Sequence, residues 1–228
     1  NCVPSRARGR YGASPSSAAP NAGYLMADGS HTLDLSAAVA SWKNDKEFNG
    51  NWGLAAIKAE AAYAWGYTGL TSVIGVIDQP VWEDHPEFVD PVNGQKKVQF
   101  ITTRGTYVYE DPYMKHRKPG VEFVYDGRIY VDGRGTVARH GTHVAGIAAG
   151  NRNTTSQTAG VMQGVAFNAR LIAADNGDPG PEDGIVKGND GNAYRAAFQA
   201  MIDNNVDIIT NSWGNGVKGA TWKYADAA

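Results

Sequence analysis

The sequence predicts an α/β fold with a doubly wound, mainly parallel β-sheet. The run at 73–77 is nearly continuous in apolar, mostly β-branched residues, which is typical of a central parallel strand covered on both faces. Two further short strands are expected at Leu171–Ala174 and Val206–Thr210. Between them, apolar residues recur at helical spacing: Tyr194, Ala197, Phe198, Met201 and Ile202. Strands that alternate with helices favour a parallel sheet with helices on both sides.

The first 30 residues predict a disordered arm or linker. From Val3 to about Gly29 the chain is rich in Pro, Ser, Ala and Gly, carries three arginines, and shows no sustained hydrophobic period. We expect order to begin between His31 and Trp42, so that residues 31–228 form one domain.

A helix is expected before the first core strand. Leu54, Ile57, Ala61 and Ala64 would share one helical face, and Gly66 would end the helix.

The segment from Val98 to Gly133 is expected to be rich in β-structure, with an inserted β-hairpin from Val121 to Val131. Apolar residues alternate from Val121 to Tyr125, Asp126-Gly127 is a two-residue turn, and Ile129 and Val131 alternate on the return.

Composition excludes some partners. The 228 residues are 42% hydrophobic and carry a net charge of −2, which gives no sign of a nucleic-acid-binding surface. No apolar run is long enough to cross a membrane. Membrane contact would need a lipid on Cys2, the only cysteine, or a C-terminal domain outside this chain; a free thiol in the arm is the alternative for Cys2.

His140 lies in the stretch V-A-R-H-G-T-H-V-A-G-I-A-A-G, from Val137 to Gly150. Its small residues predict a helix packed tightly on a sheet. At the start of that helix, free N–H groups and the helix dipole disfavour a positive charge on the imidazole, as a general base requires. A structural histidine is the alternative.

Asp78 directly follows the strand at 73–77, at the edge where ligands bind parallel sheets. It either fixes a turn or orients His140 and stabilises its imidazolium form. In the second case, Asp78 and His140 would be two of the three residues that form an activated nucleophile, and the third would be a serine.

Four segments together resemble subtilisin-like serine proteases, the subtilases: V-I-G-V-I-D with His85-Pro86 after it, H-G-T-H-V-A-G-I-A-A-G, G-V-A-F-N-A-R-L and I-I-T-N-S-W-G. The resemblance covers roughly Trp52 to Gly214 and implies that Asp78 and His140 are the triad acid and base. It also implies a subtilisin-like fold, incomplete here, with residues 31–228 as the N-terminal portion of a catalytic domain. The leader from Trp52 to Gly69 looks like that of subtilases exported as autotransporter passengers.

The same resemblance makes Ser212, Trp213 and Gly214 a substrate-binding segment. The family's S-x-G backbone pairs with an extended polypeptide as an added strand. Trp213 replaces the usual aliphatic residue, and packing in the core is its alternative role.

The sequence departs from the family pattern in three places. Gln79-Pro80 follows the aspartate where a small residue and Gly are usual, and the 62 residues from Asp78 to His140 are more than in compact members. No G-T-S motif and no A-x-G-N segment after Gly214 occur, so we expect the nucleophilic serine beyond Ala228 and no activity from this chain alone.

No cofactor is expected for catalysis, but two metal sites come into consideration. A structural calcium ion would use Glu87, Asn151 and Asn153, whereas a solvated turn is the simpler interpretation of that loop. A zinc site would use the H-x-x-H pair His140 and His143. Its other ligands would be Asp78 and His85, whereas His31 and His116 are expected at the surface.

The sequence thus predicts a serine endopeptidase, secreted or on the bacterial cell surface. Its partners would be a polypeptide substrate and the remaining C-terminal part of the same protease. A non-catalytic peptide-binding module or pseudoenzyme is the main alternative, and a metal hydrolase the next.

Overall fold

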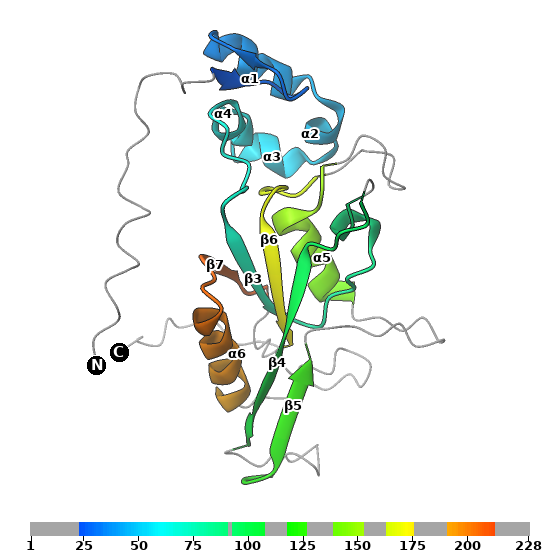
Figure 1. Ribbon diagram of the computed structural model, residues 1–228, viewed down its shortest axis with the longest axis vertical. Helices are drawn as coiled ribbons and strands as arrows, with labels where there is room; N and C mark the ends of the chain where they lie inside the picture. The colour runs from blue at the N-terminus through cyan, green and yellow to red at the C-terminus, as the bar shows by residue number, and fades with distance from the viewer. Residues whose placement is uncertain are drawn as a thin grey trace, which may run out of the picture. The chain divides into compact units, whose positions relative to one another are not determined.

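The computed structural model describes residues 23–90, 93–107, 118–126, 139–152, 163–175 and 191–212 (Figure 1). The chain divides into two compact units, at residues 1–67 and 68–228. The single domain expected over 31–228 is therefore split, and each unit is described here by itself.

The N-terminal unit begins with a short antiparallel hairpin and continues with four helices. Strands β1 (Tyr24–Leu25) and β2 (His31–Thr32) pair with each other. Residues 23–30, which we expected in the arm, thus belong to a folded element; residues 1–22 lie outside the described residues. The helices are α1 (Leu35–Lys43), α2 (Lys46–Gly50), α3 (Trp52–Ala56) and α4 (Ala59–Ala64).

Aromatic side chains form the core of this unit. Trp42 and Tyr63 are each 1% exposed, and their ring centroids lie 4.9 Å apart. The indole N–H of Trp42 donates to the carbonyl of Leu25 (2.9 Å), which ties the hairpin to α1. Buried aromatic rings with a satisfied polar atom are strong anchors for so small a unit.

The single helix expected over Leu54–Ala64 is wrong. Lys58 has a φ of 58°, in the left-handed region, and the helix is broken there into α3 and α4. The break turns Ile57 outward, where it is 60% exposed, and leaves Ala61 exposed as well. Apolar spacing suggested one face, but the backbone turn rotates the second helix relative to the first.

The C-terminal unit is built on a five-stranded sheet in the order β5-β4-β6-β3-β7. Its strands are β3 (Val73–Asp78), β4 (Val98–Thr106), β5 (Glu122–Asp126), β6 (Arg170–Asp175) and β7 (Ile208–Thr210). All neighbours pair in parallel except β4 and β5. The predicted α/β class with a mainly parallel sheet is confirmed.

Two helices cover opposite faces of this sheet. In Figure 1, α5 (Arg139–Ala149) and α6 (Gly191–Asp203) lie on either side of the β3–β6 pair. Residues of β3 alternate between the faces, with Ile74 and Val76 in the cluster under α5 and Val73 and Ile77 in the cluster under α6. This two-sided burial explains the continuous apolar run, and it confirms the doubly wound arrangement.

The insertion begins within β4. Its first part, Val98–Ile101, pairs in parallel with β6, and its second part, Thr102–Thr106, pairs antiparallel with β5. β5 therefore pairs with β4. The return strand predicted after Asp126-Gly127 lies outside the described residues and stays a prediction. The rings of Tyr107 and Phe123 pack against each other beside the β4–β5 pair, with their centroids 5.2 Å apart.

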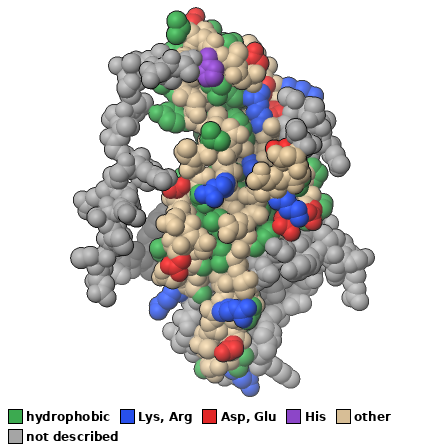
Figure 2. Space-filling model, viewed as in Figure 1, with side chains coloured by type: hydrophobic (Ala, Val, Ile, Leu, Met, Phe, Trp, Pro, Cys, Tyr) green, Lys and Arg blue, Asp and Glu red, His purple; other side chains and the backbone are tan. Residues whose placement is uncertain are grey.

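No helix among the described residues is long and apolar enough to cross a membrane. On the face shown in Figure 2, basic and acidic side chains are interspersed. This mixture agrees with the small net charge of −2.

Candidate active site

Asp78 is the last residue of β3 and is 1% exposed. It pairs in register with Asp175, the last residue of β6, so both acids lie at the carboxyl edge of the sheet. A buried carboxylate needs hydrogen-bond donors, and Asp78 Oδ1 accepts the main-chain N–H of Gln79 at 2.7 Å. Its Oδ2 is buried and has no hydrogen-bond partner within the described part of the chain.

His140, the second residue of α5, supplies the other partner of Asp78. Its Nδ1 lies 2.7 Å from Asp78 Oδ1, and its side chain is 48% exposed. A carboxylate on Nδ1 favours the tautomer with the proton on that nitrogen, which leaves Nε2 as the basic atom. Among the described residues, nothing else bonds to the ring. The carboxylate of Asp78 is therefore buried, whereas the imidazole of His140 is half exposed.

Gly141 explains why the start of α5 can reach Asp78. A Cβ at this position would overlap the carbonyl oxygen of Gln79 and lie 3.0 Å from that of Pro80. Only glycine permits such close backbone contact. The departure at Gln79-Pro80 leaves one hydrogen bond of Asp78 in place, because the main-chain N–H of Gln79 makes it.

Thr142 fixes the helix start to the same loop. Its hydroxyl oxygen accepts the main-chain N–H of Trp82 at 3.0 Å. Further along α5, Ala145 and Ala149 are 1% and 0% exposed and belong to the cluster on β3 and β6. The predicted tight packing of small residues on the sheet is confirmed, and it holds the imidazole at a set distance from the strand end.

The proposed substrate-binding segment is described only at its first residue. Ser212 is exposed and follows β7 by two residues, at the carboxyl edge that also carries Asp78. Trp213 and Gly214 lie outside the described residues, so both interpretations of Trp213 stay predictions.

The four residues considered for zinc do not form a cluster. The described part of the chain includes all of them, and it holds no group of three or more His, Cys, Asp or Glu side chains placed to bind a metal. His85 instead caps the 3₁₀ helix η2 (Pro86–Phe88), where its Nδ1 accepts the N–H of Glu87 at 3.2 Å. Burial lowers the pKa of His85, and a nearby Glu87 carboxylate offsets part of that effect. His143 and His31 are exposed, and His116 lies outside the described residues.

Two of the three calcium candidates lie close together. The main-chain N–H of Asn151 donates to the carbonyl of Glu87 (2.8 Å), and the Asn151 side chain donates to the carbonyl of Val89 (3.1 Å). Asn153 lies outside the described residues. A lysine, Lys97, lies at the same corner and interacts with Glu87.

Comparisons with known proteins identify the family of this chain. A model of the subtilase family, Peptidase_S8, matches residues 69–228, most of the chain. The chain belongs to the subtilase family. The match begins one residue after the start of the C-terminal unit, so it does not include the leader from residue 52 that also looked subtilase-like.

Two curated relatives from Serratia marcescens are each named an extracellular serine protease. They are 34% and 36% identical to the chain over 174 and 177 residues, which is 76% and 78% of its length. The chain spans 12% and 13% of the length of these relatives. The solved structure of the Clostridium perfringens CspB protease aligns with a TM-score of 0.40 at 18% identity, over 67% of this chain and 32% of that one.

Sequence reasoning missed two charged residues of the C-terminal unit, one at the sheet edge of Asp78 and one at the corner of the calcium candidates. Asp175 ends β6 as Asp78 ends β3, and the pattern of an apolar run closed by an aspartate is the same in both segments. Lys97 gave no sequence signal of its own, because it stands beside Lys96 in a polar stretch. Its role emerges only from the packing around it.

Proposed function

We propose that the protein carrying this chain is a serine endopeptidase in which Asp78 and His140 are the acid and base of the catalytic triad. The observation that carries the proposal is the 2.7 Å contact between the buried carboxylate of Asp78 and a half-exposed imidazole at a helix start. Membership of the subtilase family supports it, since the two residues stand in that family's order.

In this proposal each group has a separate task. Asp78 holds the Nδ1 proton of His140, so Nε2 is free to take the proton of a serine hydroxyl as that oxygen attacks a peptide carbonyl. The imidazolium that forms is stabilised by the Asp78 charge, and it then protonates the leaving amine. Burial of Asp78 keeps its carboxylate out of competing contacts with water.

We further propose that the nucleophilic serine comes from a segment of the protein outside these 228 residues. The absence of a G-T-S motif and the small share of the Serratia relatives that the chain spans support this. The chain alone would then be inactive, because loss of the nucleophile from a triad costs about 10⁶ in turnover.

The substrate would be a polypeptide bound in extended form. Ser212, Trp213 and Gly214 would offer main-chain groups at the carboxyl edge of the sheet, where a peptide can pair as an added strand. Action outside the cell is the setting that the names of the Serratia relatives support. Export as an autotransporter passenger rests on the leader at 52–69 alone.

Labelling with a fluorophosphonate tests the proposal on the intact protein. The wild type should be labelled on one serine and should hydrolyse a chromogenic peptide. Asp78→Asn should slow both reactions about 10⁴-fold, because the imidazole loses the carboxylate that holds its tautomer. His143→Ala is the matched control: it removes an exposed histidine three residues along the same helix and should change neither rate.

Other outcomes would favour the alternatives. An intact protein that binds peptide but takes no label would be a non-catalytic binding module. Activity that a chelator abolishes, zinc restores and His143→Ala lowers would indicate a metal hydrolase.

A further inference from the structure

Lys97 places a cation inside the C-terminal unit, away from the Asp78–His140 pair. Its Nζ donates to the carbonyl of Ala149 at 2.8 Å and to that of Phe167 at 2.7 Å. Burial lowers the pKa of Lys97 to about 8, with the Glu87 carboxylate acting in the opposite direction. An amine with that pKa is still mainly protonated at pH 7.

The Ala149 carbonyl belongs to the buried C-terminal end of α5. The last carbonyls of a helix have no partner within it, and this end of the helix is partially negative. The main-chain N–H groups of residues 164–166 donate to the carbonyls of Gly150, Ile147 and Ala148, at 2.9 to 3.0 Å. Because α5 has no basic residue in its own last turn, Lys97, the residue before β4, supplies the cation for Ala149.

Lys97 joins three segments that are far apart in the sequence, one through its main chain and two through its amine. Its own main chain is held by η2, since the N–H of Lys97 donates to the carbonyl of Phe88 at 2.9 Å. The side chain then reaches the end of α5 at Ala149 and the turn before β6 at Phe167. Glu87 of η2 adds the negative charge.

A calcium ion does not fit this corner while Lys97 is protonated. Glu87 and Asn151 were its candidate ligands, but the positive charge of Lys97 already acts on Glu87. The Asn151 amide donates its NH₂ to Val89, so its orientation is set by that bond. Two adjacent cations in a poorly solvated place repel each other strongly.

We infer that the ammonium of Lys97 is the structural cation of this corner, holding η2, the end of α5 and the turn before β6 together in place of a calcium ion at Glu87 and Asn151. Its Nζ binds two main-chain carbonyls, which are ligands that a calcium ion also uses, and it lies in the field of the Glu87 carboxylate.

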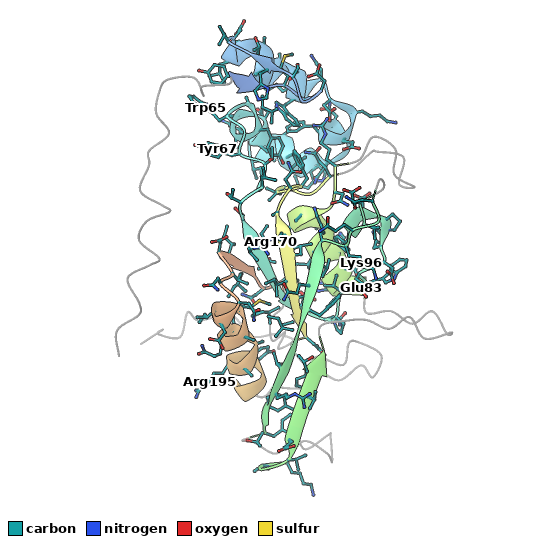
Figure 3. The ribbon with its side chains drawn as sticks, viewed as in Figure 1. Trp65, Tyr67, Glu83, Lys96, Arg170 and Arg195 are labelled. Carbon is teal, nitrogen blue, oxygen red and sulfur yellow. The ribbon has the colours of Figure 1, made fainter. Side chains whose placement is uncertain are left out.

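Thermal unfolding of the intact protein tests this inference with a matched pair of variants. Lys97→Ala removes the partly buried amine, and Lys96→Ala removes its exposed neighbour. The Nζ of Lys96 lies 2.7 Å from Asp84 and 3.3 Å from Glu83, which Figure 3 labels beside it. Lys97→Ala should lower the unfolding temperature by at least about 4 °C, because two carbonyls and Glu87 lose their cation. Lys96→Ala should lower it by less than about 2 °C.

Calcium and a chelator then separate an internal cation from a metal site. Calcium should raise the unfolding temperature of Lys97→Ala more than that of the wild type, since the emptied corner keeps its oxygen ligands. A calcium ion bound elsewhere should raise the unfolding temperature of both proteins equally, so it would not change the difference between them. Glu87→Gln, made in the protein that retains Lys97, should leave the calcium-induced shift unchanged.

Two results would overturn the inference. One is an equal effect of Lys97→Ala and Lys96→Ala on the unfolding temperature. The other is a smaller calcium-induced shift in Glu87→Gln, which would place a calcium ion at this corner beside Lys97. The second measurement stands even if Lys97→Ala does not fold.

Discussion

Gly141→Ala would test whether the close backbone contact at the start of α5 positions the base. The added Cβ would overlap the carbonyl oxygen of Gln79, lie 2.8 Å from the carbonyl carbon of Gln79, and lie 3.0 Å from the carbonyl oxygen of Pro80. All three are backbone atoms, so no flexible side chain can move aside. Because ordinary contacts between carbon atoms are about 3.5 to 4.0 Å, helix and loop must separate by roughly 1 Å.

That separation is large compared with the contact it disturbs. Asp78 lies on the strand side and His140 on the helix side, and 2.7 Å joins Oδ1 to Nδ1. A shift of about 1 Å would take this pair beyond hydrogen-bond distance. We expect kcat/KM for peptide hydrolysis to fall about 10²-fold, and the free energy of unfolding to fall by about 1–3 kcal/mol.

Gly146→Ala supplies the control. It is the same substitution in the same helix, and a Cβ there would meet no atom within 4 Å. We expect unchanged activity and a helix stabilised by up to about 1 kcal/mol. Peptide hydrolysis and denaturant unfolding would be measured for both variants of the intact protein. Equal activity of Gly141→Ala and Gly146→Ala would refute the argument that this contact sets the position of His140.

Two further predictions concern the loop between Asp78 and η2. Thr142→Val should lower the free energy of unfolding by about 1 kcal/mol, since the Trp82 N–H loses its acceptor, and Thr142→Ser should restore that stability. Denaturant midpoints would measure both effects. An unchanged free energy of unfolding in Thr142→Val would contradict this prediction. Because burial lowers the pKa of His85, the unfolded state binds the proton at higher pH than the folded state does. Stability should therefore be lost as the pH falls from about 6.5 through the folded-state pKa of His85. His85→Asn, which keeps an acceptor for the Glu87 N–H, should flatten that part of the curve of unfolding temperature against pH.

Local patterns predicted the fold of the C-terminal unit well. The run at 73–77 is apolar throughout because both faces of β3 are covered, and the helix after His140 is rich in small residues because it lies on the sheet. The N-terminal unit was predicted less well. One left-handed residue, Lys58, broke a helix that apolar spacing favoured, because spacing records which residues are apolar and not where the backbone turns.

The sequence by itself determined the family, the strand that ends in Asp78 and the helix that begins near His140. Only the tertiary structure brought these two side chains within 2.7 Å across 62 residues of sequence. It alone also distinguished Lys96 from Lys97, which are the same residue type side by side in the sequence. Lys96 pairs with Asp84, whereas Lys97 is partly buried and donates to the last carbonyl of α5. The physical reason is that periodicity reports the environment along one element, whereas the partner of a charge is set by which other elements pack beside it.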